Sequence, residues 1–343
     1  MTEEKPIENV VSGGPILGSS QGPIHPVFRL LLSIVVLFAA YLAAGLFAGM
    51  TAASPRVFDL VFRPLFLAFL LAGFCFLLKT ADEVDGSPFT AMGLSIKGPW
   101  LRDASSGLLI GFLLISIAYV VIRLTCQTTA TFHLSAKAGK LLLAEVVILS
   151  TGAMAEEVAF RGYPFQRLVD VMNEVVRWLV GKRLLISHRE LASNAGPFVA
   201  AVVWSCAFGA VHAGNPGVSV IALLNTAFVG ILFCLAYFRT RSLWMPWGIH
   251  FAWNAALGVV FGLPVSGLRD FSVVVRTRVQ GPAWISGGNY GIEGSVLGTS
   301  VIVIGIVLVQ IFVTQRGQCS AAMQIVDAER TDNDRLGPES IQS

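Results

Sequence analysis

Two adjacent carboxylates, Glu156 and Glu157, lie in a stretch of otherwise apolar residues, with Arg161 four positions after Glu157. Residues four apart share one face of a helix, so Glu157 and Arg161 can form an ion pair. Glu156 points about 100° away, and its carboxylate therefore remains available to a catalytic partner or a water molecule. A charge at the centre of a membrane helix costs about 2.5 to 3.5 kcal/mol on insertion scales, so each such group marks a candidate functional site.

Two histidines follow in later apolar stretches at the same four-residue spacing, His212 after Phe208 and His250 before Asn254. A glutamate and a histidine can together take a proton from water and return it to a leaving amine. A histidine N–H and an asparagine amide on one helix face can donate to the oxyanion of a tetrahedral intermediate. These residue types predict hydrolysis by an activated water, with no serine or cysteine nucleophile.

The elements that must position these residues are membrane helices. Of the 343 residues 55% are hydrophobic and only 13% are charged, which excludes an ordinary soluble domain. With 24 basic and 21 acidic residues the chain is nearly neutral, so we expect no nucleic-acid partner. A span needs about 20 apolar residues, and eight windows approach that length: 28–50, 57–79, 104–124, 139–160, 197–213, 218–238, 243–263 and 295–315. The predicted fold class is all-α, a polytopic transmembrane helical bundle of about eight spans.

The chain divides into a membrane-embedded domain over residues 28–315, with a motif core at 140–262, and flexible cytosolic tails at 1–27 and 316–343. Between spans four and five, the segment Val169–Asn194 alternates apolar and polar residues, which predicts an interfacial helix. Gly196-Pro197 indicates a helix break before span five. For Glu293, in a glycine-rich loop before the last span, a structural role is favoured.

Most Lys and Arg residues fall on one side of the membrane when the N-terminus is placed in the cytosol. Both termini are therefore expected to be cytosolic, in an integral multi-pass protein that lies in the plasma (inner) membrane if the source is bacterial. The expected partners are membrane lipid and a protein or peptide substrate.

The three motifs, in this order on successive spans, resemble those of the CPBP family of intramembrane glutamic endopeptidases: Glu156-Glu157-x-x-x-Arg161, Phe208-x-x-x-His212 and His250-x-x-x-Asn254. That family includes the eukaryotic endopeptidases that trim prenylated CAAX proteins, and many bacterial proteins linked to bacteriocin processing or immunity. The resemblance implies an intramembrane endopeptidase. Its substrate is not implied, because bacterial members have no evident need for CAAX trimming.

Carried over by position, Glu156 and His212 would activate the water, and His250 and Asn254 would form the oxyanion hole. Glu157, Arg161 and Phe208 would support the site structurally. No cofactor is expected. Zinc is possible but not favoured, because Glu156, His212 and His250 are acceptable ligand types but no HExxH pair is present. The alternatives are thus a zinc-dependent membrane protease using the same residues, and a non-catalytic membrane transport or immunity protein.

Overall fold

The computed structural model describes residues 23–84, 86–133, 138–180 and 189–313. The predicted tails fall mostly on residues 1–22 and 314–343, outside this range. The N-terminal half contains α1 (Pro26–Thr51), α2 (Pro55–Thr80), α3 (Pro88–Met92), α4 (Trp100–Thr125), β1 (Gln127–Phe132), α5 (Ala138–Arg161) and α6 (Tyr163–Val180). The C-terminal half contains α7 (Arg189–Ala210), α8 (Val220–Thr240), α9 (Trp244–Ala255), the π-helical turn η2 (Ala256–Val260), β2 (Val275–Gln280), α10 (Ala283–Ser286), the 3-10 turn η3 (Ile292–Gly294) and α11 (Val296–Phe312).

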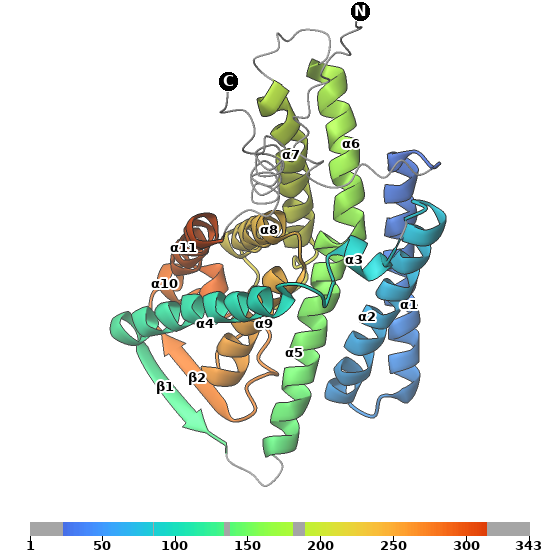
Figure 1. Cartoon of the computed structure of the whole chain (residues 1–343). Coiled ribbons are helices and arrows are strands. Elements are labelled where there is room, and N and C mark those ends of the chain that lie inside the picture. The colour runs from blue at the N-terminus through green and yellow to red at the C-terminus, as the bar shows by residue number, and fades with distance from the viewer. Residues whose placement is uncertain (1–22, 85, 134–137, 181–188, 314–343) are drawn as a thin grey trace, which may run out of the picture.

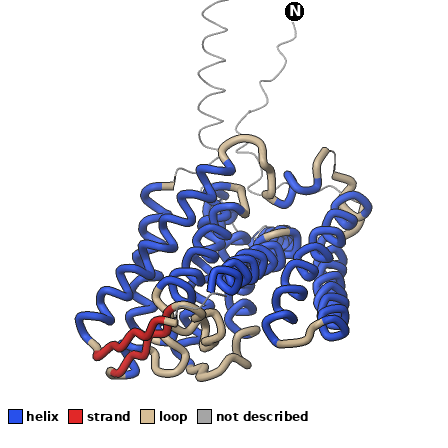
Figure 2. Tube along the Cα trace, turned by 90° about the horizontal axis from the view of Figure 1, so that it is seen from below, coloured by secondary structure: helices blue, strands red, loops and turns tan. Residues whose placement is uncertain are grey.

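The helices pack into a bundle in which α1 and α2 lie together along one edge, next to α5 and α6 (Figure 1). Seen from below, that pair forms one side of the bundle, and the two strands lie at the opposite side (Figure 2). Several helix starts are set by local chemistry. Ser54, Ser219 and Ser295 each accept a hydrogen bond from the backbone N–H three residues later, which caps α2, α8 and α11.

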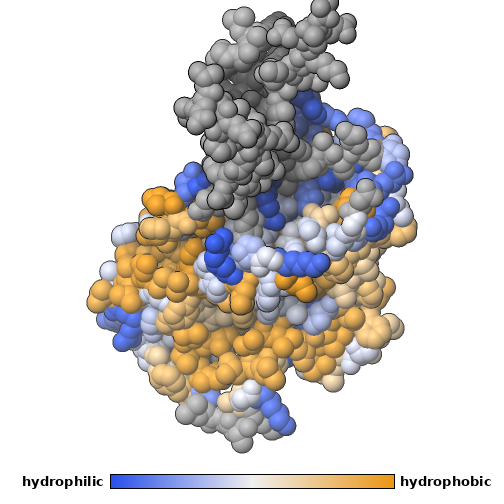
Figure 3. Space-filling model, viewed as in Figure 1, coloured by the Kyte–Doolittle hydropathy of each residue, from blue (hydrophilic) through white to orange (hydrophobic). Residues whose placement is uncertain are grey.

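The outer surface is apolar over a broad area, and hydrophilic residues gather toward the end where α6 and α7 project (Figure 3). Within the described residues, five helical segments are long and apolar enough to cross a membrane: Pro26–Thr51, Pro55–Thr80, Trp100–Thr125, Ala138–Leu179 and Val220–Thr240. Two shorter apolar helices cover Ala195–Ala210 and Val296–Phe312. Each of the eight predicted windows contains a helix, although in the seventh α9 has only 12 residues before η2. The all-α polytopic membrane bundle is confirmed, and the count of eight crossings stays a prediction.

The segment expected to form an interfacial helix, Val169–Asn194, covers most of α6 and the start of α7, and its residues 181–188 lie outside the described part of the chain. α6 follows α5 after Gly162 alone. Its first half, Tyr163–Asp170, is buried in the bundle. Farther along, Trp178 and Leu179 expose their apolar side chains, as a helix at a membrane surface would. α6 therefore runs from a buried first half to a more exposed second half, and the interfacial location of that second half stays a prediction.

The predicted break at Gly196-Pro197 is wrong, because α7 runs through both residues. A Cβ on Gly196 would lie 2.2 Å from Oδ1 of Asn173 on α6. The glycine is thus needed for the close packing of α6 against α7, and a proline inside a membrane helix is tolerated where neighbouring groups compensate for its missing N–H.

A two-stranded antiparallel sheet was not expected from the sequence. It pairs Gln127 with Gln280 and Phe132 with Val275. The buried Thr277 of β2 donates its hydroxyl to Phe261 O at 2.6 Å, which fastens β2 to the end of η2. The strands are six residues each and far apart in the chain, so no turn signal or long alternation marks them.

α9 owes its position to unusually close packing against α4. A Cβ on Gly107 would lie 2.3 Å from Met245 O, and one on Gly111 would lie 2.3 Å from Ile249 O. From the opposite side, a Cβ on Gly248 would lie 2.6 Å from Ala104 O. Small residues four apart let two membrane helices approach at backbone distance, so α4 fixes the helix that carries His250 and Asn254.

Candidate active site

The two neighbouring carboxylates of α5 have different partners, as their adjacent positions on the helix predict. Glu157 is fully buried, and its Oε1 lies 3.3 Å from Nη1 of the buried Arg161. Arg161 also donates from Nη2 to Gly230 O at 3.2 Å, and its guanidinium lies 4.6 Å from the centre of the Phe208 ring. These contacts join α5 to α7 and α8, the helices that carry the other candidate residues.

His250 on α9 lies between the two carboxylates. Its Nδ1 is 2.8 Å from Glu157 Oε1, where the ring N–H donates to the carboxylate, and its Nε2 is 3.7 Å from Glu156 Oε2. Phe233 of α8 stacks on the ring at 4.9 Å between centroids. The Glu156 side chain is 32% exposed, whereas that of His250 is 8% exposed, so Glu156 is the more accessible of the two.

His212 follows the end of α7, in the turn after Ala210. Its Nδ1 lies 2.8 Å from Phe208 O, four residues earlier. A carbonyl oxygen can only accept, so this bond places the hydrogen on Nδ1 and leaves the lone pair of a neutral ring on Nε2. The spacing of Phe208 and His212 thus sets the tautomer of the histidine as well as its direction.

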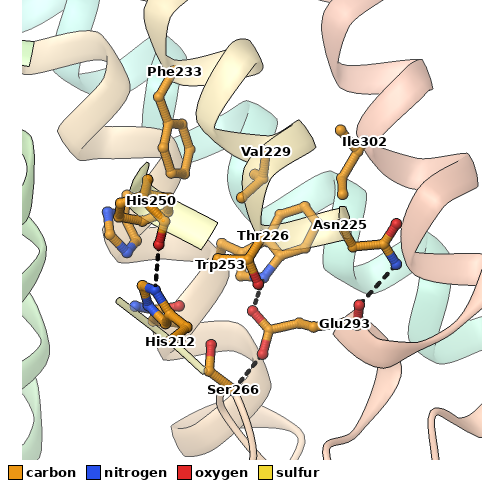
Figure 4. A pocket seen from close by; sticks show the side chains of 12 residues that line it. His212, Asn225, Thr226, Val229, Phe233, His250, Trp253, Ser266, Glu293 and Ile302 are labelled. Atoms are coloured by element: carbon orange, nitrogen blue, oxygen red, sulfur yellow. Dashed lines mark hydrogen bonds between the residues drawn. The ribbon is translucent and has the colours of Figure 1, made fainter. Parts of the chain in front are cut away.

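His212, His250 and Asn254 line one cavity of about 30 Å³ (Figure 4). That volume suits one or two water molecules. Glu156 is not among the lining residues, and it meets the site through its contact with the His250 ring. The rest of the wall comes from Phe208, Asn225, Thr226, Val229, Phe233, Trp253, Ser266, Glu293 and Ile302.

Several of these lining residues were missed by sequence reasoning, or were given another role. Glu293 was expected to be structural. In the structure Trp253 Nε1 donates to Glu293 Oε1 at 3.0 Å, and Ser266 N donates to Glu293 Oε2. Burial raises the pKa of Glu293, and these hydrogen bonds oppose the rise. The sequence signal for these residues was weak. It consisted of a carboxylate among glycines just before an apolar span, and of one amide, Asn225, within the apolar stretch that forms α8.

Other buried charges lie away from the cavity. Glu145, at the far end of α5 from the motif, forms an ion pair with Arg56 at 2.7 Å. Asp82 bridges Arg29 of α1 and Arg167 of α6, and Arg167 lies 3.3 Å from Asp170. Within the described part of the chain, no group of three or more His, Cys, Asp or Glu side chains is arranged to hold a metal ion.

Comparison with known proteins finds a family match. Residues 138–256 match the model of a family described as type II CAAX prenyl endopeptidase Rce1-like. No curated protein and no solved structure matches the chain. The matched segment begins with α5 and ends two residues after Asn254, so it contains all three motifs. Over this segment, the chain is similar to the Rce1-like family, in agreement with the resemblance that the motifs indicated.

Proposed function

We propose that this protein is an intramembrane endopeptidase that hydrolyses a peptide bond of a membrane-associated protein or peptide with a water activated by glutamate and histidine. The match to the Rce1-like family supports, at the family level, a CAAX-type membrane peptidase that acts on a peptide substrate. The finer assignment is supported chiefly by one observation, the water-sized cavity between His212, His250 and Asn254.

The proposed base chemistry uses the free lone pair of His212. The attacking water would give one proton to Nε2 of His212 while its oxygen bonds to the scissile carbonyl carbon. Glu156, which lies beside His250, would accept a hydrogen bond from the other O–H of this water and so make its oxygen more nucleophilic. The proton on His212 would then pass to the leaving amine as the C–N bond breaks, so the histidine ends in its starting state.

His250, as an imidazolium whose Nδ1–H bonds to Glu157 and whose Nε2–H is left to donate, and Asn254 are the proposed oxyanion donors. They stand one helical turn apart on α9 and both line the cavity. Glu157 orients the His250 ring through Nδ1, and Arg161 neutralises Glu157. Removal of a single oxyanion donor typically lowers the rate of a hydrolase by about 100- to 1000-fold.

We also propose that the reaction needs no bound metal, against the zinc-dependent alternative. Both proposed histidine roles use ring nitrogens in acid–base or hydrogen-bonding functions. Metal analysis of purified, active protein separates the two: activity that persists at well below one zinc per chain supports the proposal. Stoichiometric zinc that is lost together with activity contradicts it.

The decisive experiment compares Glu156→Gln with Glu145→Gln, a matched substitution on the same helix. Each is expressed in a host that lacks the native gene, and the C-termini of membrane proteins are profiled by mass spectrometry. We expect Glu156→Gln to accumulate uncut C-termini, with residual cleavage at most about 1% of wild type, because the carboxylate beside His250 is lost. Glu145→Gln should retain cleavage, since Glu145 pairs with Arg56 outside the cavity.

Normal cleavage by membrane-inserted Glu156→Gln protein would exclude this mechanism. A profile identical in wild type, variant and the host without the gene would instead favour the non-catalytic transport or immunity protein.

The position in the membrane is part of the proposal. The chain is an integral membrane protein. We place both termini on the cytosolic side, in the plasma (inner) membrane if the source is bacterial, because the loops predicted to face the cytosol carry most of the basic residues.

A further inference from the structure

Glu293 lies outside the matched segment, in η3, yet its side chain reaches the same cavity as His212, His250 and Asn254 (Figure 4). One carboxylate oxygen accepts the indole N–H of Trp253, and the other accepts the backbone N–H of Ser266. An ionised carboxylate can accept on both oxygens at once, so this environment suits a negative charge.

The loop that carries Glu293 is held from several sides. Asn225 of α8 donates to the backbone oxygens of Glu293 and Ser295, each at 2.8 Å. Thr299 of α11 in turn donates to Asn225 Oδ1 at 2.7 Å. Gly287 has a φ of +72°, and a Cβ there would lie 1.6 Å from Gly291 O, so the turn requires glycine. These contacts direct the carboxylate toward the cavity.

The charge of Glu293 is coupled to His212. A protonated His212 lowers the pKa of Glu293, against the rise caused by burial. Both side chains line the same cavity, so the Glu293 carboxylate lies close to where His212 would become positively charged. The other titratable groups around the cavity are His250, with Glu156 and Glu157 on its two ring nitrogens, and Tyr290, whose hydroxyl lies 3.4 Å from Thr226 Oγ1.

We propose that Glu293 is a positioning residue whose carboxylate stabilises the imidazolium that His212 becomes when it takes the proton of the attacking water. The O–H bond of the water breaks toward Nε2, the water oxygen bonds to the carbonyl carbon, and the proton later leaves with the amine. The carboxylate never accepts that proton. A buried carboxylate that lines the same cavity would stabilise the charged ring through space, while the bond from Nδ1 to Phe208 O sets the orientation of the ring. The inference rests on the proposed function and adds a residue from beyond the matched segment.

The first test needs no substrate. Full-length protein with ¹⁵N-labelled histidine is studied by NMR in detergent micelles, and the spectrum of His212→Gln identifies the His212 signal among the five histidines. At a fixed pH of about 6.5, we expect Glu293→Gln to lower the ratio of protonated to neutral His212 by about threefold to tenfold. Thr299→Val is the control, because it removes an anchor of the loop and keeps the charge.

An unchanged ratio in Glu293→Gln would overturn the proposal, as would an equal fall in Thr299→Val, which would assign the effect to loop position alone. The second test measures cleavage of the substrate found by C-terminal profiling. We expect Glu293→Gln to lower kcat by about 10-fold or more with little change in KM, and Glu293→Asp to restore part of kcat.

The two hypotheses fail separately. Cleavage that survives in Glu156→Gln would reject the proposed hydrolytic mechanism, whereas the NMR ratio would still measure the coupling of Glu293 to His212. If Glu156→Gln is inactive and the ratio is the same in Glu293→Gln and wild type, only the role of Glu293 is rejected.

Discussion

Glu157 shows, at the scale of single residues, how a full charge is kept inside an apolar bundle. Its carboxylate has two partners, Nη1 of Arg161 and Nδ1 of His250. Arg161 is held in turn by a backbone carbonyl and by the faces of Phe208 and Phe233, where a cation is attracted to the aromatic rings. The pair therefore orients a proposed oxyanion donor and also links α5 to α7, α8 and α9.

Loss of Arg161 should be strongly destabilising, because Glu157 would remain as an uncompensated buried charge. We expect Arg161→Met to lower the free energy of unfolding by about 3–5 kcal/mol. Thermal unfolding of the purified variants in detergent measures this. The double variant Glu157→Gln/Arg161→Met serves as the control and should recover part of the loss, since no charge is left unpaired. A single variant as stable as the wild type would contradict the assignment.

Glu293 should make stability depend on pH. Burial raises its pKa in the folded protein, so the folded state binds this proton more tightly than the unfolded state. Stability from this group is therefore greatest below the ordinary glutamate pKa and falls as the pH rises through the raised value. Melting temperatures measured across that pH range should fall less steeply for Glu293→Gln than for wild type. Parallel curves would contradict the assignment.

Which residues could be found from sequence depends on whether their partners are local. Glu157 with Arg161, and His212 with Phe208, lie four apart on one helix, so periodicity alone relates them. The two lining residues Asn225 and Glu293 come from separate elements, and only the folded loop brings them together. The buried cluster around Asp82 escaped notice for the same reason, since its arginines come from α1 and α6.

At the scale of elements, the contact between α4 and α9 decides where the proposed oxyanion donors lie. Gly107 and Gly111 face the backbone of α9, and Gly248 faces that of α4. A side chain at any of these positions would separate the helices. His250 and Asn254 would then move with α9 relative to His212, which is carried by α7.

The same substitution at two glycines tests this packing. We expect Gly111→Ala to lower the free energy of unfolding by about 1–3 kcal/mol, because the new Cβ would overlap Ile249 O. Gly49→Ala in α1 is the matched control, since a Cβ there meets no atom within 4 Å. It should be neutral or slightly stabilising by up to about 1 kcal/mol. Equal melting temperatures for both variants would show that α4 and α9 have room to adjust.

Apolar windows predict membrane helices well because a span must satisfy its own backbone, whatever its neighbours are. Features that depend on a neighbour were mispredicted. In the helix that continues through Pro197, Gly196 packs closely against Asn173 of α6. The sheet joins two strands that are far apart in the chain.

At the scale of the whole molecule, the exposed apolar surface and the positions of the basic loops define an orientation. Lys97 precedes α4 and Thr131 lies in β1 beyond its other end, and both residues are exposed. In the proposed orientation, Lys97 faces the cytosol and Thr131 the opposite side.

Cysteine labelling checks the orientation. In a version whose native cysteines are replaced by alanine, Lys97→Cys should react with a membrane-impermeant maleimide only after the membrane is opened. Thr131→Cys should react in intact cells, because the reagent reaches the outer side directly. The reverse pattern would invert the proposed topology, and reaction of both residues in intact cells would show that α4 does not separate the two sides.

The backbone contact between α4 and α9 also bears on how small a working version of this protein can be. Residues 138–256 contain every motif, but a chain trimmed to that segment would leave the groove at Gly248 facing lipid and would lack the loop of Glu293. A truncated enzyme must keep α4 and the stretch through α11. Truncation from the N-terminus past Trp100 should therefore abolish activity, and the family segment by itself would be inserted and inactive.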